Sequence, residues 1–150
     1  EMRDRETITT AITAAETGHL VLATLHTTGS ARTVDRIIDQ FPPDQQEQIR
    51  IQLSVSIIAV LSQVIMPRED TAGRIAAFEI MMMTSAIENH VRKGETFKIG
   101  SVIQTSKKEG MILLDDFLAN LYKDGRIDRQ TALDKCQDPR QMAMKLGGVG

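Results

Sequence analysis

Hydrophobic residues recur at helical spacing over most of the chain. Near the start, the apolar residues from Ile8 to Ala15 fall on one face of a helix expected over 7–16, and Gly18 suits its end. The same spacing, with prolines, glycines and capping residues between the segments, predicts further helices over residues 31–41, 44–60, 85–93, 96–105, 111–123 and 128–136, and from 139 onward. Helices therefore dominate the prediction, above all in the last third.

Two parts of the chain have strand character instead. Residues 19–26 are apolar on nearly both faces, which favours a strand in a parallel sheet that helices cover on both sides. Residues 61–66 and 74–82 flank the turn-forming stretch 67–73 and predict a β-hairpin. The predicted fold class is α/β, with a mostly parallel sheet in the first third, then the hairpin, then an all-helical region.

Composition and charge exclude several classes of protein. Of the 150 residues 41% are hydrophobic and 25% charged, which excludes disorder as the main state. The net charge of −2 gives no general attraction to nucleic acid or anionic lipid, so we expect no nucleic-acid partner. No apolar run approaches the ~18 residues of a membrane span, so we expect no direct membrane insertion and a cytoplasmic location. Cys136 is the sole cysteine, which excludes an internal disulfide and a CxxC metal site, and we predict no metal held by protein ligands alone.

The two ends of the sequence suggest a piece of a longer protein. The first residue is Glu1 rather than an initiator methionine. The last five residues, 146–150, are rich in glycine, and we expect them to be frayed.

Several blocks of the sequence are similar to one family. The stretch from Thr13 to Thr27, TAAETGHLVLATLHT, resembles the PilT-type pilus-retraction ATPases of twitching motility, which belong to the type II/IV secretion ATPase superfamily. The resemblance runs over roughly residues 1–140. Its other blocks are EMRDRETI at 1–8, DRIIDQFP at 35–42, IRIQLS at 49–54 and GRIAAFEI at 73–80.

The resemblance implies a fold, cofactors and partners. Residues 1–83 would be the second half of a RecA-like P-loop ATPase core, and residues 84–150 a helical C-terminal region. The family works as a homohexameric ring with ATP and Mg²⁺, and it acts on an inner-membrane pilus platform protein. The resemblance therefore implies a cytoplasmic protein held at the inner membrane through the pilus machinery.

The resemblance also assigns roles to polar residues. Glu1 matches the Walker B acid, and His19 and His26 match the two histidines of the His box. Arg3 matches a place where arginines face the nucleotide of a neighbouring subunit, a role that suits a guanidinium. Read without the family, Glu1 is a solvated terminal charge, Arg3 an exposed helix-start charge, and each histidine a hydrogen-bonded residue at a strand end. Within one strand the two histidines would point to opposite faces, so they would not share a metal ion.

Arg74 is a weaker candidate for a nucleotide contact. An ion pair at the strand edge, with Asp70 or Glu79, explains an arginine at this place equally well.

The helix after the hairpin resembles the family's AIRNLIR motif. Glu88 and His90 depart from the family pattern. The resemblance implies a role in retraction rather than in hydrolysis, so that changes at the first two motif positions would remove retraction alone; an ordinary packed helix is the alternative. The positions that keep the motif's character are Ala86, Ile87, Asn89, Val91 and Arg92.

One expected motif is missing. No G-x-x-x-x-G-K-[ST] loop occurs in the sequence, so we expect this stretch to be inactive by itself. Two alternatives to a retraction ATPase stay open: a pilus-extension or type II secretion ATPase, and a non-catalytic module that only packs in a ring. The absence of a CxxC…CxxC insertion favours retraction over extension.

Overall fold

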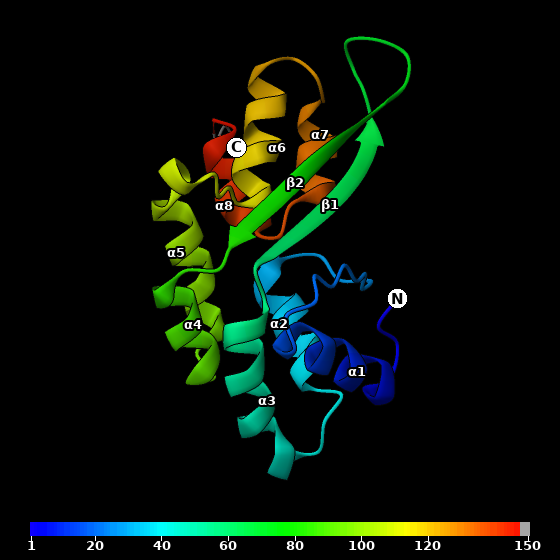
Figure 1. Cartoon of the computed structure of the whole chain (residues 1–150). Coiled ribbons are helices and arrows are strands. Elements are labelled where there is room, and N and C mark those ends of the chain that lie inside the picture. The colour runs from blue at the N-terminus through cyan, green and yellow to red at the C-terminus, as the bar shows by residue number, and fades with distance from the viewer. Residues whose placement is uncertain (148–150) are drawn as a thin grey trace.

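The computed structural model describes residues 1–147 and consists mainly of helices around one long β-hairpin (Figure 1). The elements in chain order are α1 (Arg5–Glu16), α2 (Ser30–Ile38), α3 (Pro43–Ser56), β1 (Ala59–Pro67), β2 (Arg74–Met82), α4 (Ser85–Arg92), a 3₁₀ turn (Thr96–Lys98), α5 (Ile99–Thr105), a second 3₁₀ turn (Lys107–Glu109), α6 (Leu114–Lys123), α7 (Arg129–Lys135) and α8 (Pro139–Lys145).

The hairpin is the part of the fold that connects the others. β1 and β2 pair antiparallel in a continuous register from Ala59 opposite Met82 to Pro67 opposite Arg74. In Figure 1 the hairpin runs from the helices α2 and α3 at its base to α6 and α7 alongside its upper half. The predicted hairpin is confirmed, and so is the helical region that follows it.

Two hydrophobic cores lie at the two ends of the hairpin. The first joins α1–α3 to α4 and α5, and includes the fully buried Ile8, Val34, Met81, Ile87 and Ile99. The second joins the upper hairpin to α6–α8; its buried members include Met66, Leu118 and Met142. The first core draws residues from both sides of position 84, and the division into 1–83 and 84–150 stays a prediction.

Several helix boundaries differ from the prediction. α3 begins at Pro43, with Pro42 before it as the cap, because a proline fits the first helical turn, where no N–H partner is needed. The helix ends at Ser56, Ile57 caps it, and β1 begins at Ala59 in place of a continued helix.

The strand expected over 19–26 is wrong for the described chain. This stretch connects α1 and α2 without regular structure, and Leu20 and Leu22 are 77% and 89% exposed. A strand that is apolar on both faces needs paired neighbours and covering helices. Within residues 1–147 the sheet has only the two antiparallel strands, and neither of them pairs with 19–26.

The C-terminal end is better ordered than expected up to residue 147. Leu146 is buried in the second core, so fraying does not begin there. The remaining part of the tail expected to be frayed, 148–150, lies outside the described residues. Within residues 1–147 no helix has the length and apolar character needed to cross a membrane.

Asp116 on α6 forms an ion pair with α8 at the second core. Its carboxylate contacts Lys145 Nζ at 2.5 Å and Lys107 Nζ at 3.2 Å. Partial burial disfavours ionisation, but the hydrogen bonds from the two lysines outweigh it, so the pKa of Asp116 lies below its ordinary value.

We expect the substitution Asp116→Asn to remove part of the acid sensitivity of the fold. A carboxyl with a lowered pKa stabilises the folded state above its unfolded value of about 3.9 and loses that contribution as the pH falls through the folded value. The melting temperature of the wild type should therefore exceed that of the variant at neutral pH, and the gap should close in acid. The control Asp44→Asn changes an exposed carboxylate, and a gap of equal size there would contradict this explanation.

Candidate functional site

The N-terminal segment and the loop before α2 bring three predicted site residues together. Glu1 Oε1 lies 2.6 Å from Arg3 Nε and 2.8 Å from His26 Nε2. The Glu1 side chain is 27% exposed, whereas Arg3 and His26 are 75% and 83% exposed. A carboxylate thus lies at the surface between a guanidinium and an imidazole.

Local backbone contacts explain why these residues meet. The amide of Met2 donates to the carbonyl of Thr24 at 3.0 Å, which fixes the first residues beside the loop that carries His26. Asp4 ends the segment by capping α1, because its carboxylate accepts from the Thr7 amide at 2.8 Å. The two contacts therefore hold the segment that follows Glu1 between the loop and the start of α1.

The cluster favours an ionised carboxylate. The hydrogen bond from Arg3 lowers the pKa of the Glu1 carboxyl; burial opposes this shift, and the nearby His26 adds to it. The same contact raises the pKa of Arg3. Both contacts use Oε1, so the second oxygen of Glu1 takes no part in either of them.

A hollow of about 510 Å³ adjoins the cluster. Besides Glu1, Arg3 and His26, its lining includes Arg36 and Gln40. A carboxylate suits magnesium and its bound water, and the two arginines suit phosphate oxygens. The residues therefore fit one side of a magnesium–nucleotide site, while the loop that would cradle the phosphates is not part of this sequence.

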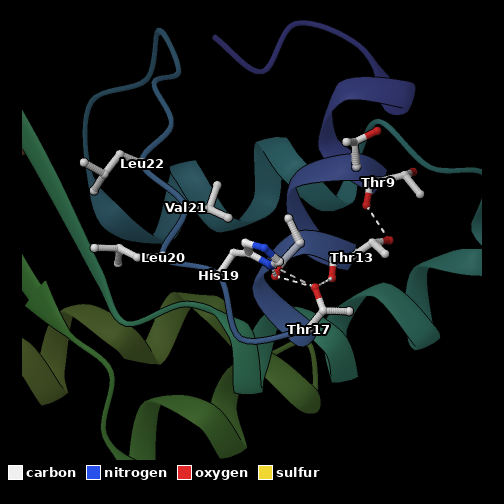
Figure 2. Close-up of a pocket in the computed structure, with 9 residues that line it drawn as sticks. Thr9, Thr13, Thr17, His19, Leu20, Val21 and Leu22 are labelled. Atoms are coloured by element: carbon white, nitrogen blue, oxygen red, sulfur yellow. Dashed lines mark hydrogen bonds between the residues drawn. The ribbon is translucent and has the colours of Figure 1, made fainter.

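His19 lies apart from this cluster. Its Nδ1 is 3.2 Å from Thr17 Oγ1 and 3.3 Å from the carbonyl oxygen of Ala14, at the end of α1. Figure 2 shows His19 beside the threonines of α1, in a separate open hollow that Leu20 and Leu22 also line. The structure thus places the two predicted His-box residues in different surroundings.

Arg74 lies at the loop end of the hairpin, away from Glu1. It opens β2 opposite Pro67 and is exposed. The alternative explanation, an ion pair with Asp70 or Glu79, is wrong within residues 1–147. Asp70 contacts Arg68 at 2.6 Å and Arg126 at 3.5 Å, and Glu79 is buried with other partners.

The helix that resembles the retraction motif has an inner and an outer face. Ile87 and Val91 are fully buried in the first core, so this pair forms the inner face. Ala86 and Arg92 are exposed, and Asn89 is half-buried. The outer face, rather than the apolar stripe, is available to a partner.

Glu79 is a buried polar residue that was not expected from the sequence to hold distant segments together. Glu79 is 3% exposed and lies on the same face of β2 as the buried Ala77 and Met81. The signal was present, because side chains two positions apart along a strand share a face. A carboxylate in phase with two buried apolar residues must find hydrogen-bond donors.

Comparison with known proteins identifies relatives over nearly the whole chain. Residues 1–72 match the family model of the type II/IV secretion system protein. The chain is 46% identical over 143 residues, 95% of its length, to the "Twitching motility protein" of Neisseria gonorrhoeae. It is also 46% identical over 93% of its length to the type IV pilus retraction ATPase PilT of Pseudomonas aeruginosa. It spans 38% and 40% of the lengths of these relatives.

A solved structure is similar in fold. The crystal structure of the pilus retraction motor PilT with bound ADP matches 94% of this chain with a TM-score of 0.85 and 39% identity, and the chain covers 39% of it. The match to the pilus assembly ATPase PilB of Pseudomonas aeruginosa is shorter, with 38% identity over 63 residues, 42% of this chain and 10% of that protein.

Proposed function

We propose that this chain belongs with the PilT-type retraction ATPases of the type II/IV secretion family, and that the protein containing it is an ATP-hydrolysing motor that retracts type IV pili. The observation that carries the proposal is the contact of Glu1 with both Arg3 and His26, in a chain similar to the retraction ATPases over nearly its whole length. Relatives named for assembly match less than half of it, which favours retraction over extension.

The cluster suggests how this chain contributes to ATP hydrolysis. Bound Mg²⁺ would supply charge stabilisation at the phosphates. Glu1 has an oxygen outside its two contacts, suited to orient the attacking water and accept its proton. Arg3 is mostly exposed, as an arginine must be if it reaches a nucleotide held by a neighbouring subunit.

The histidines and Arg74 take different places in this proposal. His26 contacts Glu1 directly, so it would respond to the γ-phosphate through that carboxylate. His19 would contribute from the separate hollow at the end of α1. Arg74, at the far end of the hairpin, could reach only a nucleotide presented by another part of the assembly.

We further propose that the protein acts as a homohexamer with ATP and Mg²⁺ as cofactors. The exposed outer face of α4 supports a ring partner. Residues 1–83 would complete the RecA-like core and residues 84–150 would form the region nearest the pilus platform protein, on the cytoplasmic side of the inner membrane.

Two measurements on the full-length protein test this proposal: Mg²⁺-dependent ATP hydrolysis, and pilus retraction in cells that lack the endogenous motor. We expect both activities. A protein that assembles into rings but neither hydrolyses ATP nor restores retraction would instead support the non-catalytic packing module. Hydrolysis accompanied by pilus extension would support the assembly ATPase.

The outer face of α4 gives a separate prediction. We expect Arg92→Ala in the full-length protein to reduce retraction while ATP turnover remains at the wild-type rate, because the side chain is exposed and lies outside the Glu1 cluster. Twitching and ATP hydrolysis would be measured in parallel, with the exposed neighbour Lys93→Ala as control. Equal loss of both activities would show that the helix has no role specific to retraction.

A further inference from the structure

The hairpin carries a buried pair of polar residues that lies outside the proposed ATPase site. Glu79 on β2 is 3% exposed, and its cross-strand partner on β1, Ser62, is 4% exposed. Polar side chains buried to this degree must be satisfied by hydrogen bonds or destabilise the fold. The partners of this pair therefore show what it holds in place.

Both oxygens of Glu79 accept hydrogen bonds from distant parts of the chain. Oε1 accepts from the amide of Ser30 at 2.7 Å, at the start of α2. Oε2 accepts from the amide of Leu114 at 3.3 Å, at the start of α6, and from Gln137 Nε2 at 3.0 Å, in the connection between α7 and α8. One carboxylate thus ties α2 to the C-terminal helices.

Ser62 holds the same turn from the neighbouring strand. Its hydroxyl accepts from the amide of Gly29 at 2.8 Å and lies 3.3 Å from the carbonyl oxygen of Thr27, to which it donates. The turn 27–30 directly follows His26, the imidazole that contacts Glu1. Together Ser62 and Glu79 fix this turn at its beginning and at its end.

The turn is closely packed against Gln137 as well. Gly29 has a φ of +100°, and a β-carbon at that position would lie 2.9 Å from Gln137 Nε2. The backbone conformation therefore favours glycine at this position, and a β-carbon there would displace the end of the Gln137 side chain. The side chain that contacts Glu79 is also the one that closes over the turn.

We propose that Glu79 is a positioning residue for ATP hydrolysis. It holds the turn 27–30, and through it His26, in the geometry that contacts Glu1, and Gln137 extends this restraint to the C-terminal helices. This inference rests on the proposed ATPase function and adds a residue that touches neither the nucleotide nor the reacting water.

The test is Glu79→Gln in the full-length protein. The glutamine amide is nearly isosteric with the carboxylate. In either orientation, however, its NH₂ group replaces an oxygen that accepts from N–H donors, so at least one of these hydrogen bonds is lost and the turn is held less firmly. We expect kcat per bound nucleotide to fall about tenfold while the Kd for ATP is unchanged, since displacement of a catalytic group by about 1 Å can cost more than this. A purely structural defect would instead lower the fraction of protein that binds nucleotide and leave kcat per bound nucleotide at the wild-type value, which would overturn the proposal.

The matched control is Glu69→Gln, the same change at an exposed position in the hairpin loop. We expect this variant to keep the wild-type kcat.

A second readout is independent of activity. Nuclear magnetic resonance follows the imidazole signals of His26, which a His26→Gln variant assigns. We expect Glu79→Gln to shift the His26 signals and leave those of His19 unchanged, because only His26 adjoins the turn. Unmoved His26 signals would overturn the proposal even if the wild type proved inactive, whereas wild-type inactivity with shifted signals would overturn only the proposed ATPase function.

If Glu79→Gln fails to fold, the variant Gln137→Ala tests the same proposal. Gln137 is exposed, and its truncation removes one hydrogen bond to Glu79 while the bonds from Ser30 and Leu114 remain. We expect a smaller fall in kcat, about threefold, in line with the loss of one hydrogen bond. Unchanged kcat and unchanged His26 signals would show that the C-terminal helices are not coupled to the turn.

Discussion

Glutamine in place of Glu1 is expected to reduce ATP turnover by the full-length protein at least about 100-fold, the range lost with a general base. The amide keeps the shape of the side chain and can still accept from Arg3, so the cluster should stay assembled. It cannot take the proton of the attacking water. Nucleotide binding, measured by equilibrium titration, should therefore remain close to that of the wild type.

The control for this variant is Glu6→Gln, which removes an equal charge from the exposed first turn of α1. We expect it to leave turnover unchanged. Wild-type turnover in Glu1→Gln would contradict the role of Glu1, and loss of nucleotide binding would mean that the carboxylate holds the site together rather than acting in the chemical step.

Truncation of Ile87 to alanine is expected to lower the free energy of unfolding by about 2–5 kcal/mol, the cost of emptying a fully buried isoleucine site. Ile87 is 0% exposed and belongs to the first core. The sequence alone suggested that changes at Ala86 and Ile87 would both remove retraction and spare hydrolysis. The structure separates these positions: Ala86 is exposed and tests the retraction surface, whereas Ile87→Ala tests packing.

Urea unfolding, followed by circular dichroism, measures this loss. Ile58→Ala is the matched control, because Ile58 is 65% exposed and its truncation leaves little cavity. Equal destabilisation by the two variants would contradict the central place of Ile87 in the core. A stable Ile87→Ala protein that hydrolyses ATP but does not retract pili would restore the functional interpretation of this position.

Sequence pattern predicted the hairpin well because its signals are local. Alternating burial along each strand and the turn-forming residues 67–73 depend on near neighbours in the chain, and the register follows from them. The helices were found for the same reason. Their ends were less accurate, since the apolar residues from Ala59 onward are compatible with either a helix or a strand until β2 pairs with them.

The strand prediction for 19–26 failed because its information is not local. An apolar run is typical of a buried strand only if another strand lies beside it. No described element does so, and the segment instead serves as the loop that carries His26 to Glu1. The pattern identified residues that need burial, but not what would bury them.

By itself the sequence determined the helices, the hairpin, the family resemblance and the residue types at the candidate site. Such features follow from local periodicity and from the order of residues along the chain. Only the tertiary structure decided that His26 contacts Glu1 while His19 does not, and that Glu79 joins α2, α6 and the connection before α8. These contacts link residues up to 58 positions apart, and their geometry exists only once the hairpin and its two cores have packed.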